Sequence, residues 1–147
     1  MFKSPKINMN KKNKFFIKRN QSFKVSKNIF LSFKYALNGI LFCFQSTRNF
    51  RIQCLLGLSV FLLTLIFNLG LYEYLILTTT VLSVLVLELL NTAIESLADI
   101  IVGKKFSKLA KISKDCSAGA VLLASINSIF VACYIFIPKI KILIQNS

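Results

Sequence analysis

The 147-residue sequence contains no histidine. This absence excludes, within the chain, metal sites built on histidine and catalysis by Ser-His or Cys-His pairs. The four cysteines form no C-x-x-C pair, so we expect buried free thiols. The glycine-rich patterns G-x-x-x-x-G-K-[ST] and G-x-G-x-x-G are also missing. If the chain handles a nucleotide, it must do so with acids, lysine and a metal ion.

Acidic residues are scarce, with five Asp and Glu against 19 Lys and Arg. Three of the five acids lie in one segment, "LELLNTAIESLADI" (87–100), in the later half of an apolar run. The basic residues flank the apolar runs: twelve lie in residues 1–51, five in 104–114 and two near the C-terminus. That distribution is typical of a membrane protein, so we expect no nucleic-acid partner.

Long apolar runs define the class of the protein. The chain is 55% hydrophobic, and the run 54–70 carries no charge. We predict an all-α integral membrane protein with three spans, at about 52–70, 75–101 and 117–138. "LYEY" (71–74) is expected to form a short loop, 103–115 a polar basic loop, and Pro138 to end the third span.

Two segments precede these spans. Residues 1–28 are rich in Lys, Asn and Ser, which predicts a basic, disordered tail. Residues 29–46 carry apolar side chains at helical spacing, which predicts an amphipathic helix in the membrane interface. With three spans, the N-terminal region and the 103–115 loop share a face, and their positive charge predicts that this face is cytoplasmic.

Four polar residues of the acidic segment share one face of a helix. At 100° per residue, they project within an arc of about 80°. These residues are Glu88, Asn91, Glu95 and Asp99. Acids inside a membrane are costly and need partners. Spacing alone leaves three hypotheses: a catalytic or metal site, an ion or transport path, and structural pairing with lysines such as Lys114, which precedes Asp115.

The motifs "ELLNTAIESLAD" and "LAKISKDCSAGAVLL" resemble those of the prokaryotic diacylglycerol kinase family, which includes undecaprenol kinases. "SFKYALNGI" and "RNFRI" are similar to its N-terminal helix and the entry to its first span, so the resemblance covers about residues 29–137. It implies an inner-membrane homotrimer with active sites shared between protomers. It also implies transfer of the ATP γ-phosphate to a lipid hydroxyl with Mg²⁺.

The resemblance assigns roles to individual residues. Glu88 matches the general base, Glu95 the magnesium ligand, and Asn91 a residue that orients either group. The nucleotide-binding positions are matched by Glu95 and by four further residues, Tyr35, Asp99, Lys114 and Asp115. Many members carry a magnesium-binding glutamate where this chain has Thr47. We expect Thr47 to be no ligand, which leaves open what completes the magnesium shell.

The expected function is therefore a lipid kinase domain over residues 29–147, acting on diacylglycerol. Undecaprenol is the alternative acceptor. The alternative without enzyme activity is a small oligomeric membrane protein whose acidic stripe is structural or conducts ions.

Overall fold

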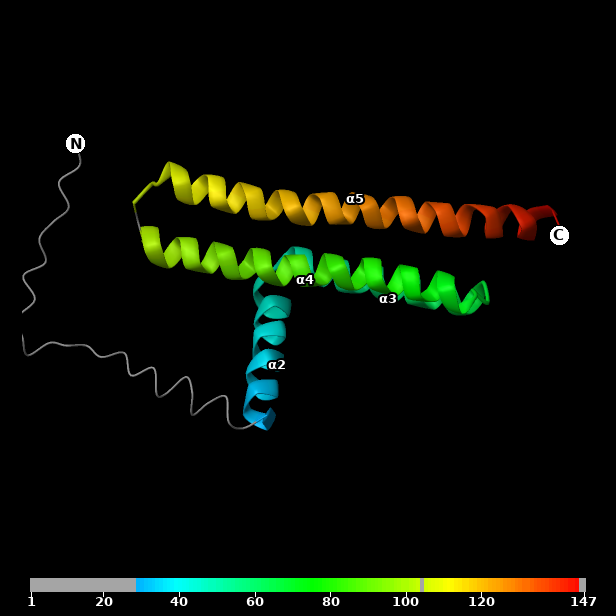
Figure 1. The fold of residues 1–147 in the computed structure, drawn as a ribbon, viewed down its shortest axis with the longest axis horizontal. Helices are drawn as coiled ribbons and strands as arrows, with labels where there is room; N and C mark the ends of the chain where they lie inside the picture. Colours follow the sequence, from blue (N-terminus) through cyan, green and yellow to red (C-terminus); the bar gives the residue numbers. More distant parts are fainter. Residues whose placement is uncertain (1–28, 104, 146–147) are drawn as a thin grey trace, which may run out of the picture. The chain divides into compact units, whose positions relative to one another are not determined.

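The computed structural model describes residues 29–103 and 105–145, and its elements are helical. They are α2 (Ile29–Ser46), α3 (Arg48–Ile66), α4 (Leu71–Val102) and α5 (Lys108–Gln145) (Figure 1). By length and composition, each of these four helices could cross a membrane. The prediction of an all-α integral membrane protein is thereby supported. The predicted basic tail, residues 1–28, lies outside the described residues.

The chain divides into two units between Gly39 and Ile40. The first unit includes the beginning of α2, and the second includes its last turns with α3, α4 and α5. The predicted helix at 29–46 is present as α2, and large apolar side chains along it are exposed. Its placement in the membrane interface stays a prediction, because length and composition would also allow it to cross the bilayer.

The connection between α3 and α4 is shorter than expected. Leu71–Tyr74 form the first turn of α4, so the predicted loop there is wrong. Glu73 explains the early start, since its Oε2 accepts a hydrogen bond of 2.9 Å from the backbone N–H of Gly70 and caps the helix. The chain reverses over the preceding residues, where Asn68 adopts a left-handed φ of 46° that asparagine tolerates well.

The connection between α4 and α5 is also shorter than the predicted 103–115 loop. Gly103, with φ of 58°, follows the last turn of α4 and donates its N–H to Asp99 O at 2.8 Å. Helix α5 begins at Lys108, and Ser107 Oγ accepts a 3.4 Å hydrogen bond from the N–H of Ala110. The second half of the predicted loop is therefore helical, which places Lys114 on a rigid element.

Pro138 lies inside α5, which continues to Gln145, so the predicted stop at this proline is wrong. Proline within a membrane helix is tolerated where neighbouring groups compensate for the lost hydrogen bond. Here the flanking residues are anchored: Ile135 and Phe136 are buried, and Lys139 forms an ion pair with Glu73 at 3.1 Å.

Helices α4 and α5 lie side by side along their length (Figure 1). At one end of the pair, Leu77 of α4 packs with Ile135 and Phe136 of α5. Helix α3 approaches α4 closely at Gly57, where an added Cβ would lie 2.7 Å from a methyl group of Val81. These contacts fix the three helices against one another at the end away from the acidic segment.

The cysteines are free, as predicted, but most are not buried. Cys43 is buried, Cys54 is half-buried, and Cys116 and Cys133 are exposed. Many large apolar side chains are exposed as well, as is expected of helices that face lipid or another protein.

Candidate functional site

The polar row of α4 changes from buried to exposed along the helix. Glu88 is 3% exposed and Asn91 is 8% exposed, whereas Glu95 is half-buried and Asp99 is exposed. The four side chains share one face of the helix, on which Gln53 of α3 contacts Glu88 and Ser117 of α5 contacts Asn91. The row therefore connects a buried carboxylate with an accessible one. We refer to Glu88, Asn91, Glu95 and Asp99 as the acidic row.

Asn91 links the middle of the row to α5. Its Nδ2 donates to Glu95 Oε1 at 3.0 Å, and its Oδ1 accepts a 2.6 Å hydrogen bond from Ser117 Oγ. The first contact joins residues four apart on one helix face, where side chains meet. The second contact crosses between helices. Together they fix the amide in one orientation, with its NH₂ group toward the carboxylate.

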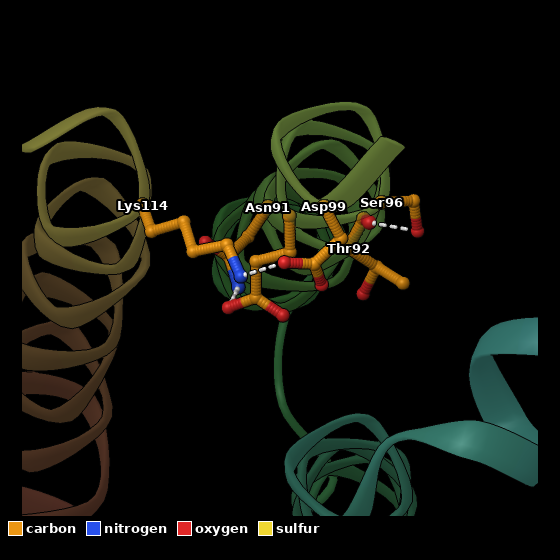
Figure 2. Close-up of polar contacts among 6 residues, drawn as sticks. Asn91, Thr92, Ser96, Asp99 and Lys114 are labelled. Carbon is orange, nitrogen blue, oxygen red and sulfur yellow. Dashed lines mark hydrogen bonds and ion pairs between the residues drawn. The ribbon is translucent and has the colours of Figure 1, made fainter. Parts of the chain in front are cut away.

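Lys114 closes the exposed end of the row. Its Nζ lies 2.5 Å from Asp99 Oδ1, and Figure 2 shows the lysine reaching from α5 toward the carboxylate on α4. The lysine side chain is 34% exposed and the aspartate side chain 71% exposed. An ion pair this accessible contributes little to stability. Lys114 and Asp99 can therefore separate at little cost, and each can then bind a ligand.

Two predicted nucleotide-binding residues are not drawn into this network. Asp115 is exposed, and the ion pairs within the described residues are those of Lys114 with Asp99 and Lys139 with Glu73. Tyr35 is 52% exposed and belongs to the unit that ends at Gly39. The roles of both residues stay predictions.

Gln53 of α3 is a polar partner that the sequence did not single out. Its Nε2 donates to Glu88 Oε2 at 3.2 Å, across 35 residues of sequence. Ser117 was missed in the same way. Both are neutral residues within or beside apolar runs, and the only available signal was that they interrupt those runs.

A cavity of about 330 Å³ extends from Gln53 between the three helices. It is mainly apolar, and α3, α4 and α5 all contribute to its walls. Its lining includes Leu56, Val60, Val84, Ser128 and Ile129. A mainly apolar cavity whose lining includes a few polar side chains, Gln53 among them, suits an amphiphilic molecule.

The row also has the chemistry to hold a divalent cation. Within residues 29–103 and 105–145, no group of three or more Cys, Asp or Glu side chains could hold a metal ion. Magnesium does not need such a group, because it is commonly held by one or two carboxylates together with substrate phosphates. Glu95 fits this role, since Asn91 orients one of its oxygens as an outer-shell partner does. Thr47 uses its hydroxyl to donate to Cys43 O at 2.8 Å.

Comparison with known proteins places these features in a family. Residues 34–136 match the family described as prokaryotic diacylglycerol kinase. A diacylglycerol kinase of Synechocystis sp. is 40% identical over 122 residues, which cover 83% of this chain and 70% of that protein.

Two further relatives carry related names. An undecaprenol kinase of Bacillus subtilis is 35% identical over 111 residues, covering 76% of this chain and 89% of that protein. A diacylglycerol kinase of Haemophilus influenzae is 33% identical over 93 residues, covering 63% of this chain and 78% of that protein. The match includes α3, α4 and most of α5, and with them the whole acidic row. The chain belongs to the prokaryotic diacylglycerol kinase family of membrane lipid kinases.

Proposed function

We propose that this lipid kinase transfers the γ-phosphate of ATP to the hydroxyl of diacylglycerol, giving phosphatidic acid. The observation that carries the proposal is the acidic row, which runs from a buried carboxylate beside an apolar cavity to an accessible acid–lysine pair. The lipid alcohol comes from the bilayer, and the nucleotide comes from water. The buried end of the row would therefore receive the lipid alcohol, and the accessible end would receive the nucleotide.

Glu88 is the proposed general base. In the reaction, the lipid O–H bond breaks, the proton passes to the Glu88 carboxylate, and the lipid oxygen forms a bond to the γ-phosphorus as the bond to ADP breaks. The burial of Glu88 at 3% exposure supports this role, because a base here meets the lipid rather than bulk water. General base catalysis of this kind contributes roughly 10²- to 10⁴-fold.

Glu95 is the proposed magnesium ligand, and Asn91 orients it. Magnesium, when bound, would neutralise charge on the phosphates, which is the main requirement of phosphoryl transfer. Lys114 is the proposed phosphate contact, for which it would leave Asp99. Asp99, Asp115 and Tyr35 are proposed to complete the nucleotide site.

The location and assembly are part of the proposal. The positive charge of the N-terminal region and of the 103–115 segment favours a cytoplasmic position for both. The exposed apolar side chains of α3, α4 and α5 leave ample surface for a homotrimer in the plasma membrane. A reporter fused near Lys108 should be found inside the cell; an external position would separate the site from ATP and contradict the assignment.

Undecaprenol is the second candidate acceptor, favoured by the similarity to the Bacillus subtilis enzyme. Purified protein with radiolabelled ATP and magnesium should label diacylglycerol at a higher kcat/KM than undecaprenol. Preference for undecaprenol would reverse the choice of acceptor. Failure with both lipids, in protein shown to be folded, would contradict the proposed kinase activity.

A further inference from the structure

The side-chain amide of Gln53 has two polar atoms, and only one of them makes a hydrogen bond. Its Nε2 donates to Glu88 Oε2 at 3.2 Å. Its Oε1 is buried and accepts no hydrogen bond within the described residues. Buried side-chain oxygens nearly always have a donor, so an oxygen of this kind needs an explanation. The carboxyl of Glu88 lies beside the same amide, within hydrogen-bond distance of Nε2.

Among the described residues, no cation forms an ion pair with Glu88. The Thr92 hydroxyl donates to the backbone O of Glu88 at 2.9 Å, and not to its carboxylate. Arg48 and Arg51 of α3 are exposed, and neither forms an ion pair with Glu88 in the described part of the chain. On α5, Lys114 is paired with Asp99. The carboxylate is therefore held by an amide rather than by a cation.

Whether the partner of Glu88 is an amide or a cation matters, because a general base must gain and lose a proton. A neighbouring cation favours the ionised form of a carboxyl and opposes its protonation. A primary amide favours neither form strongly, because it carries both a donor and an acceptor. Half a turn about the terminal bond of glutamine exchanges the two.

We propose that Gln53 is a positioning residue that holds Glu88 in both of its protonation states. While Glu88 is a carboxylate, the Gln53 NH₂ group donates to it. After the proton of the lipid hydroxyl has passed to Glu88, the amide turns and Oε1 accepts the new O–H group. Gln53 itself transfers no atom; Glu88 gains only the proton of the lipid hydroxyl, and this proton returns to water when the product leaves. This inference rests on the proposed role of Glu88 as the base.

The test compares two Gln53 variants, which differ in what they offer Glu88, with one control variant. Gln53→Met keeps a similar size but removes the hydrogen bonds, and Gln53→Lys replaces the amide by a cation. Ser83→Ala is the control, because the Ser83 hydroxyl donates to Thr79 O of its own helix and Ser83 is not among the residues that line the cavity. We expect kcat to fall roughly 10- to 100-fold in both Gln53 variants, as for loss of a hydrogen bond to a charged group, with KM for lipid changed less than about threefold. The control should match the wild type.

A readout independent of turnover is the infrared carbonyl band of protonated Glu88, identified by its loss in Glu88→Gln. In the wild type, this band should have the lower frequency of an acid that donates a hydrogen bond. In Gln53→Met, it should shift to the frequency of an unbonded acid. An unchanged band in Gln53→Met would overturn the inference, as would an unchanged kcat. If the wild type proves inactive on lipids, the band still decides whether the amide accepts a hydrogen bond from protonated Glu88.

Discussion

Helices α4 and α5 are joined by an acid–lysine pair at each end. Asp99 meets Lys114 at 2.5 Å, and Glu73 meets Lys139 at 3.1 Å. Both lysine side chains are 34% exposed. By distance and lysine exposure the two pairs are alike, yet we assign substrate binding to one and a structural role to the other.

The surroundings of each pair account for this choice. Glu73 also caps the start of α4 through Gly70, close to the apolar cluster around Leu77. At the other end, the polar side chains of the acidic row continue along one face of α4 from the exposed Asp99 to the buried Glu88, and within the row Asn91 contacts Glu95. An acid–lysine pair is thus a weak indicator of a site. Continuity of polar groups into a buried region is the stronger one.

Between the two ends of the helix pair, the largest contrast that we predict is that of Glu95→Gln with Glu73→Gln. Loss of a magnesium ligand removes several kcal/mol of charge stabilisation, so Glu95→Gln should lower kcat by at least about 100-fold. Glu73→Gln should retain near-wild-type activity, because glutamine still offers an oxygen to Gly70 N–H. Kinase assays over a range of magnesium concentrations measure both. Equal losses in the two variants would abolish the distinction between the ends.

A second contrast compares the lysines. Lys114→Met should raise KM for ATP roughly tenfold, since a hydrogen bond between a charged group and phosphate is lost. Lys139→Met should leave KM for ATP unchanged. Steady-state kinetics with varied ATP and saturating lipid test this pair. If Lys139→Met raised KM for ATP as much as Lys114→Met does, the assignment of the nucleotide to the Asp99 end of the helix pair would be wrong.

Ser117→Ala should have a smaller effect. It removes the neutral hydrogen bond that fixes the Asn91 amide, worth about 1 kcal/mol, so the magnesium concentration for half-maximal activity should rise roughly fivefold. Ser125→Ala is the control, because Ser125 donates to Val121 O of its own helix. Unaltered magnesium dependence in Ser117→Ala would show that Asn91 is held by other means.

The smallest effect concerns stability. Removing the Glu73–Lys139 ion pair by Lys139→Met should lower the free energy of unfolding by no more than about 1 kcal/mol, because the pair is accessible to solvent. Leu77→Ala, in the adjoining apolar cluster, should cost about 2–5 kcal/mol. Denaturation in mixed detergent micelles compares them. The reverse order would mean that the ion pair, not the apolar cluster, holds this end together.

The sequence predicted the helices and the acidic row well, because both depend on periodicity. The contact between Asn91 and Glu95 follows from their spacing of four residues. The turns were harder: Leu71–Tyr74 looked like a loop until the cap by Glu73 was seen, and Pro138 looked like a helix end. The Glu73 cap is a local contact that the sequence analysis missed, whereas the helix around Pro138 is held by contacts with α4 that local residue preferences could not show.

The partners of the row from other helices could not be predicted. Gln53 lies 35 residues from Glu88, and Ser117 lies 26 residues from Asn91. Neither carries a charge that would draw attention within an apolar run. Their contacts depend on how α3 and α5 pack against α4, and packing is not encoded in the spacing of a single helix.

The central claim is that the buried Glu88 takes a proton from a lipid hydroxyl. The most direct measurement is transfer of the radiolabelled γ-phosphate of ATP to diacylglycerol by purified wild-type protein and Glu88→Gln, both checked for folding in detergent. We predict labelled phosphatidic acid with the wild type and a rate lower by roughly 10²- to 10⁴-fold with Glu88→Gln. A folded Glu88→Gln protein that phosphorylates diacylglycerol at the wild-type rate would contradict the account.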